Sequence, residues 1–502
     1  MNLKERRRCV MTPVGKSDKA ILPKKPANKA GSTVAESVEG RALTERNGQQ
    51  DAGDQTQSWS NATSGLVAVR EAARKDKRLR FTNLLHHVTV DALRSSYLAL
   101  QRDAAPGADG ITWQDYQQGL EERLAELHRR VQTGGYRPRP ARRVYIPKED
   151  GSQRPLSVTA LEDKIVQQAL VSVLNAVYEV DFLGFSYGFR PGRGQHDALD
   201  ALSVGIERYK VNWIVDLDIR KFFDTVSHEW LMRFIEHRIG DKRVQRLIRQ
   251  WLEIGTYDEQ GKRIKATRGT PQGAVVSPLL ANVYLHYVMD LWTQRWRQRE
   301  ARAAMMVVRY ADDAVLGFEC EAEARRYLCA LEQRLRQFDL ALHPEKTRII
   351  RFGRFAAAQR AQRGEGKLET FNFLGFTHYY GRTRNGKFVV KRKTMVTRLR
   401  KQIKAVGQEL MRRRHAPVGI VGNWLRRVVQ GHINYYGVPF NGVALSSFCY
   451  EVRKRWYKAL CRRSQRRRLN WGRFAVIAAY WLPPVRIVHP YPHQRFDAKY
   501  ST

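Results

Sequence analysis

The chain has 502 residues, and its 89 lysines and arginines outnumber its 49 acidic residues, which gives a formal net charge of +40. Apolar residues make up 43% of the sequence, enough to build substantial cores, so the composition excludes a disordered polycation. The charge surplus disfavours an enzyme of small metabolites and favours a polyanionic partner, nucleic acid first and an anionic membrane second. At about 100–200 residues per domain, the length predicts three or four folding units.

The hydropathy pattern and the cysteines weaken the membrane alternative. No stretch approaches the ~18–20 uninterrupted apolar residues of a spanning helix, and no apolar signal-peptide core follows the basic N-terminus. The five cysteines form no C-x-x-C pair, which argues against a zinc ribbon or a disulfide framework and favours a reducing compartment. We therefore expect a cytoplasmic protein with no membrane partner.

The pattern of residue types predicts the following elements in chain order. Residues 1–65 are polar and basic with little apolar periodicity, which is typical of a flexible arm. Helical spacing then dominates as far as about residue 132, and a helix is expected to begin near Ser227, a residue type that favours the N-cap. The other predicted elements are a strand at 143–148, helices over 160–180 and 196–209, and a strand at 213–219 rich in β-branched residues.

The positive charge is concentrated in the last quarter of the chain. Residues 380–502 hold 28 lysines and arginines against three acidic residues. Within this region apolar residues recur every three or four positions over 393–414 and 445–460, and 424–436 supplies a third segment. The pattern predicts a small helical bundle with a basic exterior, because the acids that would balance its charge are almost absent.

Two groups of carboxylates stand beside apolar strands. Tyr310-Ala-Asp-Asp313 lies between the apolar runs 305–308 and 314–318, which predicts a hairpin with paired negative charge at its tip. Alone, such a pair is more often an ordinary turn. Asp218, however, ends another strand, and if these strands are neighbours in one sheet, Asp218 and Asp312 converge on a metal pair. Two Mg²⁺ ions held by oxygen ligands are the apparatus of phosphoryl transfer.

The order of motifs along the chain resembles that of the group II intron reverse transcriptase and maturase family over nearly the whole sequence. Any one motif is weak, but eight or nine in the family's order are very specific. The motifs are Arg154-Pro-Leu, Ser186-Tyr-Gly-Phe-Arg-Pro-Gly, Asp218-Ile-Arg-Lys-Phe-Phe-Asp, Gly269-Thr-Pro-Gln-Gly, Ser277-Pro-Leu-Leu-Ala-Asn, Tyr310-Ala-Asp-Asp, Leu342-His-Pro-Glu-Lys-Thr, Phe373-Leu-Gly-Phe and Gly431-His-Ile-Asn-Tyr-Tyr-Gly.

The resemblance implies an α+β fold of the right-hand polymerase type, with an antiparallel palm sheet and a C-terminal basic helical bundle. The implied domains are an N-terminal arm (1–65), an N-terminal extension with fingers (66–204), a palm (205–379), a thumb or maturase bundle (380–465) and a basic tail that binds RNA or DNA (466–502).

The resemblance also implies the roles of individual residues. Asp218, Asp312 and Asp313 match the catalytic triad that holds two Mg²⁺ ions, or Mn²⁺ in their place. Phe223 falls where the family places a ring under the sugar, which excludes a 2′-OH; it is equally open to a plain core role beside Phe222. The remaining positions expected to bind the dNTP are Lys148, Arg154, Gln272 and Lys346. The arginines expected to bind nucleic acid are Arg190, Arg412, Arg413, Arg414, Arg462, Arg463, Arg466, Arg467 and Arg468, with Trp456, Tyr457 and Trp471 as stacking surfaces.

The expected partners are a group II intron RNA, an RNA template with its DNA primer, target DNA and dNTPs, in a bacterial ribonucleoprotein associated with the nucleoid. Because no C-x-x-C pair and no His-Asn-His array follow residue 482, we expect a form that lacks the family's C-terminal DNA endonuclease. Two alternatives stay open: a domesticated reverse transcriptase of defence, diversification or repair, and an RNA-binding splicing cofactor that has lost polymerisation. On metal chemistry alone, a DNA-templated polymerase is also possible.

Overall fold

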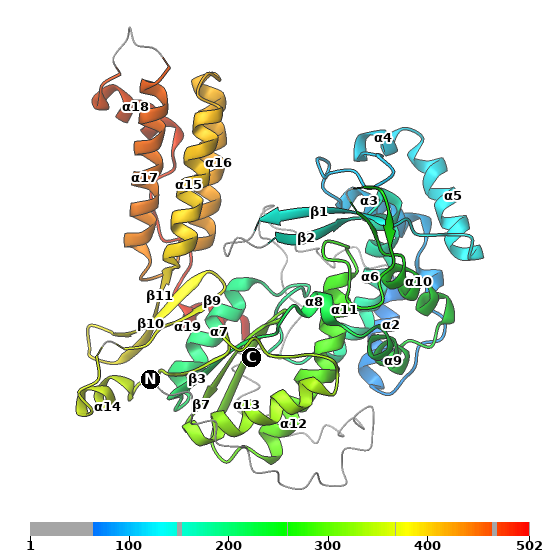
Figure 1. Cartoon of the computed structure of the whole chain (residues 1–502), viewed down its shortest axis with the longest axis horizontal. Coiled ribbons are helices and arrows are strands. Elements are labelled where there is room, and N and C mark those ends of the chain that lie inside the picture. The colour runs from blue at the N-terminus through cyan, green and yellow to red at the C-terminus, as the bar shows by residue number, and fades with distance from the viewer. Residues whose placement is uncertain (1–63, 148–152, 259, 367, 464–468, 501–502) are drawn as a thin grey trace.

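The computed structural model describes residues 64–147, 153–258, 260–366, 368–463 and 469–500. Figure 1 shows three parts: an N-terminal lobe built mainly from α2–α6 with β1 and β2, a central sheet, and a C-terminal bundle of α15–α18 that stands on the opposite side of the sheet from the lobe. Most of the predicted arm, Lys148 and the arginines 466–468 lie outside the described residues.

The central sheet has four antiparallel strands in the order β6-β7-β3-β8. Successive side chains of β3 point to opposite faces of the sheet. Val215 packs in the hydrophobic core that includes α13 (Glu321–Arg336), and Ile214 packs with α7 (Gln195–Arg208) on the other face. Because helices cover both faces, the strands read as continuous apolar runs rather than as an alternating pattern. The strands are β3 Trp213–Asp218, β6 Met305–Tyr310, β7 Asp313–Phe318 and β8 Arg348–Arg351.

The N-terminal lobe is organised around one long buried helix, α6 (Leu161–Asp181), against which α2 and α3 pack. A second sheet, ordered β2-β1-β4-β5, borders this lobe. The remaining elements of the lobe and of this sheet are α2 Ser64–Lys75, η3 Leu85–His87, α3 Val90–Ala99, α4 Trp113–Gln117, α5 Leu120–Thr133, β1 Ala141–Pro147, β2 Gln153–Val158, β4 Thr256–Tyr257 and β5 Arg263–Ile264.

Short helices connect the lobe to the central sheet. The predicted N-cap is confirmed, because the Ser227 side chain accepts a hydrogen bond from the backbone N–H of Trp230 at the start of α9. Residues 277–299 form a continuous helix interrupted by one π-helical turn, η4. The elements are α8 Phe222–Thr225, α9 His228–Arg238, α10 Lys242–Glu253, α11 Ser277–Leu285, η4 His286–Asp290 and α12 Leu291–Arg299. A further short helix, α14 (Ala356–Gln362), lies between β8 and β9.

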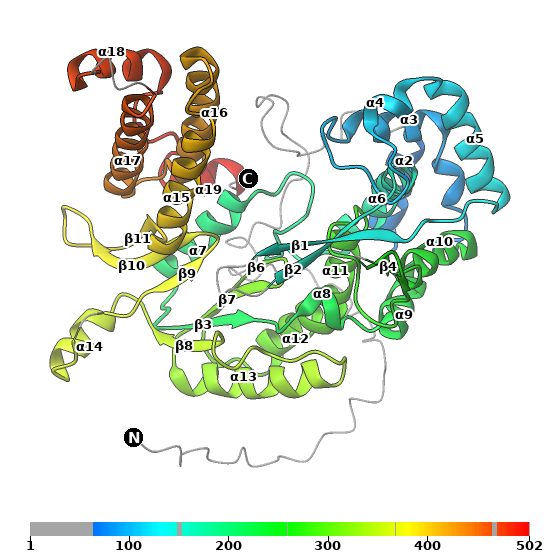
Figure 2. The ribbon, with the colours of Figure 1, turned by 45° about the horizontal axis from the view of Figure 1, so that its top comes forward.

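The C-terminal bundle follows a three-stranded sheet in the order β11-β10-β9. Its three long helices run side by side, and α18 packs across α16 and α17 (Figure 2). The apolar periodicity therefore predicted these helices correctly, including the burial of Phe448 and Val452. The elements are β9 Phe371–Phe373, β10 Phe376–Arg382, β11 Phe388–Thr394, α15 Val396–Arg412, α16 Val418–Tyr436, α17 Gly442–Cys461 and α18 Trp471–Trp481.

The last helix, α19 (Pro492–Tyr500), leaves the bundle and packs against α7 beside the central sheet. Lys499 Nζ lies 2.6 Å from Asp197 Oδ2, and Arg495 Nε lies 2.7 Å from Asp200 Oδ2. The expectation of a nucleic-acid-binding tail over 466–502 stays a prediction, but Arg495 and Lys499 of this helix already have partners within the protein. Acidic residues of α7 neutralise its cations, and this pairing was hidden because the partners are about 300 positions apart in the sequence.

The structure confirms the α+β class. No helix in the described part of the chain is both long enough and apolar enough to cross a membrane.

Candidate functional site

Three aspartates meet at one end of the central sheet. Asp218 is the last residue of β3, and in the register of the sheet it stands opposite Asp313, the first residue of β7. Asp312 lies in the tight turn between β6 and β7, directly after Ala311, whose φ of 57° is left-handed. The predicted hairpin is confirmed, and β3 and β7 are neighbours, which was the condition for Asp218 and Asp312 to lie together.

The carboxylates repel one another at this edge. Burial and then the charge of Asp218 raise the pKa of Asp312. The pKa of Asp313 is raised to about 7 by the protein packed around its carboxyl and by neighbouring aspartate charges, that of Asp312 first. Lys346 offsets part of the negative charge, since its Nζ lies 3.0 Å from Asp218 Oδ2. The cluster is thus a place where a cation is favoured.

The oxygen ligands fit Mg²⁺ better than a softer metal. Among the described residues, no three His, Cys, Asp or Glu side chains are close enough together to enclose a metal ion by themselves. Mg²⁺ does not need such a cage, because it usually takes one or two carboxylates and completes its shell with water and substrate phosphates. Asp218 and Asp312, with Asp313 beside them, could hold it in this way.

A chain of hydrogen bonds joins the N-terminal lobe to the segment after β3. Arg154 Nε donates to Gln272 Oε1 at 2.9 Å, and Gln272 Nε2 donates to Asp224 Oδ1 at 3.1 Å. The backbone carbonyl of Gln272 also accepts from the N–H of Ser157 in β2. The structure therefore brings together Arg154 and Gln272, two of the predicted dNTP-binding residues. Asp224 of α8 completes the chain as the partner of Gln272.

The adjacent rings of Phe222 and Phe223 have different surroundings. Phe222 is buried in the main core with 2% of its surface exposed, whereas Phe223 is half-buried and lines a cleft. This arrangement resolves which of the two is core and leaves Phe223 available to a ligand.

The cleft has a volume of about 1590 Å³ and passes between all three parts of the molecule. Leu100 and Arg154 contribute from the N-terminal lobe, Asp312 from the central sheet and Tyr435 from the bundle. A site of this size, lined by the Asp312 carboxylate and by Arg154, suits a polymeric substrate more than a small metabolite.

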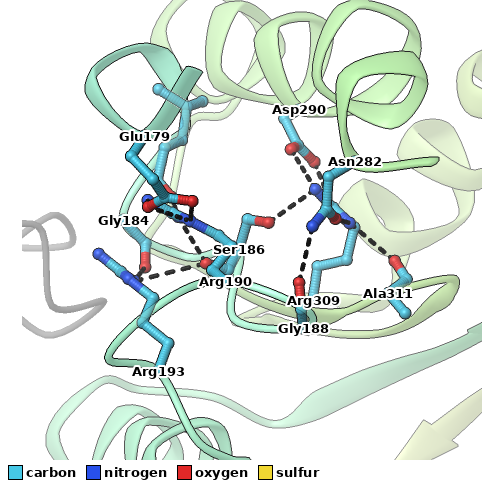
Figure 3. Close-up of polar contacts among 11 residues, drawn as sticks. Glu179, Gly184, Ser186, Gly188, Arg190, Arg193, Asn282, Asp290, Arg309 and Ala311 are labelled. Carbon is cyan, nitrogen blue, oxygen red and sulfur yellow. Dashed lines mark hydrogen bonds and ion pairs between the residues drawn. The ribbon is translucent and has the colours of Figure 1, made fainter. Parts of the chain in front are cut away.

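Arg190 does not fit the prediction that it binds nucleic acid. Its side chain is buried, its Nη2 lies 2.9 Å from Glu179 Oε2, and its Nη1 donates to the carbonyl oxygens of Leu183 and Ser186 (Figure 3). The guanidinium fixes the loop that follows α6. The polar composition of the motif around Arg190 suggests an exposed loop, but the Arg190 side chain is buried. A count of charges along the sequence does not reveal this burial.

The bundle arginines differ in how freely they face solvent. Arg412, Arg414 and Arg462 are exposed. Arg412 and Arg413 both pair with Glu409, but Arg413 also lies over the ring of Trp424, and Arg463 donates to a backbone carbonyl. The three exposed side chains are therefore the better candidates for phosphate contacts.

The aromatic residues of the bundle require one correction. Trp456 is fully buried and cannot stack on a base, since its helical spacing places it on the core face of α17. Trp471 is 45% exposed, and Tyr480, which the sequence reasoning missed, is 71% exposed on the same helix, α18. Tyr480 sits in a strongly apolar segment, and its exposure is evident only from the packing of α18.

Comparison with known proteins defines the class. Residues 146–378 match the family model described as reverse transcriptase (RNA-dependent DNA polymerase). This match covers the three aspartates, the Arg154–Gln272 chain and the whole central sheet. The chain therefore contains a reverse transcriptase domain.

Curated relatives narrow the class further. The chain is 36% identical to Protein YkfC of Escherichia coli (strain K12) over 315 residues, which are 55% of this chain and 81% of that protein. It is 30% identical to the group II intron-encoded protein LtrA of Lactococcus lactis subsp. cremoris over 288 residues, 55% of this chain and 48% of LtrA. Nuclear intron maturase 4, mitochondrial, of Arabidopsis thaliana is 29% identical over 140 residues, 28% of this chain and 17% of that protein. The chain belongs to the group II intron reverse transcriptase and maturase family.

Proposed function

We propose that the chain is an RNA-directed DNA polymerase and intron maturase that binds a group II intron RNA, assists its splicing and reverse-transcribes it during retrohoming. The observation that carries the proposal is the meeting of Asp218, Asp312 and Asp313 at one end of the central sheet, where Asp312 lines a large cleft. In this assignment residues 66–204 are an N-terminal extension with the fingers, 205–379 the palm and 380–465 the thumb or maturase bundle.

The described residues divide the work of nucleotide addition. Asp218 and Asp312 would hold Mg²⁺, with Asp313 beside them, and the bound metal supplies charge stabilisation for phosphoryl transfer. Arg154 is placed to grip the triphosphate, because a guanidinium binds phosphate oxygens in a bidentate manner. Gln272 holds Arg154 in place and lines the nucleotide pocket.

Two further residues complete the nucleotide pocket. Phe223 packs under the sugar and selects dNTPs. Lys346, beside Asp218, contributes positive charge near the triphosphate. The predicted dNTP contact of Lys148 lies outside the described residues and remains a prediction.

Primer extension on an RNA template with dNTPs and Mg²⁺ tests the polymerase function. Asp312→Ala should abolish DNA synthesis and leave RNA binding intact, whereas Asp91→Ala, which removes an exposed carboxylate of α3, should extend primers like the wild type. Extension by Asp312→Ala would show that the active site is elsewhere. No extension by the wild type, together with assisted splicing, would favour the non-polymerising splicing cofactor.

The exposed cations of the bundle support RNA binding. Each phosphate contact contributes ~0.7–0.9 to the slope of log affinity against log salt concentration. Replacing Arg412 and Arg414 by alanine should therefore lower the salt slope of intron RNA binding by about one contact per arginine lost. Asp312→Ala, which removes no cation, should leave the slope unchanged.

A further inference from the structure

Arg309 is a fully buried residue of β6 whose guanidinium is saturated by the protein (Figure 3). A guanidinium has five N–H donors. Nε and one Nη2 donor bond the two carboxylate oxygens of Asp290 at 2.7 and 2.6 Å. The other three reach Ser186 Oγ at 2.7 Å, Asn282 Oδ1 at 3.1 Å and the carbonyl oxygen of Ala311 at 2.7 Å.

The bond to Ala311 acts on the turn that carries Asp312. Ala311 adopts a left-handed φ of 57°, which is unfavourable for a residue with a side chain. Its carbonyl belongs to the peptide group that joins it to Asp312. The bond from Arg309 Nη1 therefore fixes the orientation of the peptide directly before the metal-binding carboxylate.

The same turn is enclosed from its other side by the loop after α6. A Cβ on Gly188 would lie 2.3 Å from the backbone nitrogen of Ala311, so the two backbones touch. Asn282 Nδ2 donates to the Gly188 carbonyl at 2.7 Å, and residues 185–187 bond both backbone groups of Arg309. Asn282 thus bonds both the guanidinium and the loop, and the turn is held between them.

The π-helical turn explains how two acceptors reach one guanidinium. Asn282 and Asp290 are eight positions apart, and in a regular α-helix, at about 100° per residue, they would point about 80° apart. The π turn at His286–Asp290 accommodates one extra residue. With this extra residue taken up by the π turn, Asn282 and Asp290 are related as if they were seven α-helical positions apart. Seven such steps leave the two side-chain directions about 20° from alignment, so both side chains face β6.

We propose that Arg309 is a positioning residue for the metal site: its contact with the Ala311 carbonyl, supported by Asp290 and Asn282, holds the turn so that the Asp312 carboxylate faces the cleft. The expected effect of Arg309 on the rate of primer extension rests on the proposed function. Its expected effect on metal affinity does not depend on polymerisation. Outer residues of this kind typically change metal affinity or activity by about 10–100-fold when they are replaced.

The test removes the positioning contact while limiting the damage to the fold. In the double variant Arg309→Met with Asp290→Leu, apolar side chains replace the buried ion pair, an exchange that is often neutral for stability. We expect kcat for primer extension to fall about 100-fold with little change in KM for dNTP. Mn²⁺ binding, measured by calorimetry without nucleotide, should weaken at least about tenfold.

A second buried pair provides the matched control. Arg238 and Asp181 are equally buried, 2.8 Å apart, and lie in α9 and at the end of α6. Arg238→Met with Asp181→Leu should keep both kcat and Mn²⁺ affinity. A folded Arg309 double variant with wild-type kcat and Mn²⁺ affinity would overturn the proposal, and so would equal losses in both double variants.

If the Arg309 double variant does not fold, Arg309→Lys decides. Lysine keeps the charge beside Asp290 but has no second arm for the Ala311 carbonyl, so we expect the same losses of kcat and Mn²⁺ affinity. Retention of both would refute the positioning role. If the wild type extends no primer, the polymerase function fails, and the Mn²⁺ affinities alone confirm or refute the role of Arg309.

Discussion

Asp218 and Asp313 stand opposite each other at the ends of β3 and β7. Like charges in directly opposed positions of a sheet are destabilising, so this pair is retained at a cost to the folded protein. Lys346 bonds one member of the pair, with 3.0 Å between Nζ and Asp218 Oδ2. The register of the strands therefore concentrates negative charge where a lysine and a metal ion would compete for the same carboxylate.

Removing the lysine should tighten metal binding in the absence of nucleotide. The Lys346 side chain is 63% exposed, and an ion pair at such a site contributes up to about 1 kcal/mol. Lys346→Met should therefore raise the affinity for Mn²⁺ by up to about fivefold in calorimetric titrations, while primer extension slows because a contact near the triphosphate is lost. Unchanged or weaker Mn²⁺ binding would show that Lys346 does not compete for Asp218.

Local sequence patterns predicted the elements whose contacts are between residues close in the sequence and the helices with a strong apolar periodicity. The hairpin at Asp312, the helices of the bundle and the end of β3 at Asp218 all follow from runs of apolar residues. From the sequence, the adjacency of β3 and β7 could be stated only as a condition, because the residues of a strand do not reveal which other strand pairs with it. The similarity to known relatives establishes the family.

Long-range packing explains what the sequence did not reveal. Trp456 is buried although cations surround it in the sequence of α17, and Tyr480 is exposed although its segment of α18 is strongly apolar. The resemblance implies that Arg190 binds nucleic acid, although Glu179 pairs with it inside the protein. The docking of α19 on α7 depends on pairs such as Arg208 with Asp497, 2.6 Å apart, between residues nearly 300 positions apart.

The ion pairs between α7 and α19 differ in burial, so the pairs of Asp200 and of Asp497 should differ in strength. Asp200 accepts from Arg392 at 3.1 Å and from Arg495 at 2.7 Å, and it is buried. Asp200→Ala leaves two arginines unpaired and should cost about 3–5 kcal/mol. Asp497→Ala breaks the exposed pair with Arg208 and should cost at most about 1 kcal/mol. Urea unfolding followed by tryptophan fluorescence measures both, and equal losses would contradict this ranking.

A buried histidine should make the fold sensitive to acid. His378 is inaccessible in β10 and stacks on Phe371, and burial, followed by the charge of Arg392, lowers its pKa to about 3. In the unfolded chain the ring takes up a proton near pH 6.5. The unfolded state therefore binds more protons between these values, and stability present above pH 6.5 is lost as the pH falls.

Replacing this histidine by phenylalanine should flatten the pH dependence. His378→Phe keeps a ring against Phe371 but cannot be protonated, so it removes a loss of up to about 1.4 kcal/mol per pH unit below 6.5. Urea unfolding of both proteins at pH 7, 6 and 5 tests this. Parallel stability profiles would mean that His378 is protonated in the folded protein as readily as in the unfolded chain.

The neighbouring rings of α8 provide the sharpest test of nucleotide selection, because they differ in position but not in chemistry. Phe223 lines the cleft and Phe222 is core. Phe223→Ala should lower the preference for dNTP over rNTP, as a ratio of kcat/KM values, by about 10–100-fold, since a steric contact of this size discriminates by about 1–3 kcal/mol. Phe222→Leu should keep the preference and reduce stability by about 1 kcal/mol. Selectivity that falls equally in both variants would mean that the rings act through packing alone, and selectivity that survives Phe223→Ala would place the sugar elsewhere in the cleft.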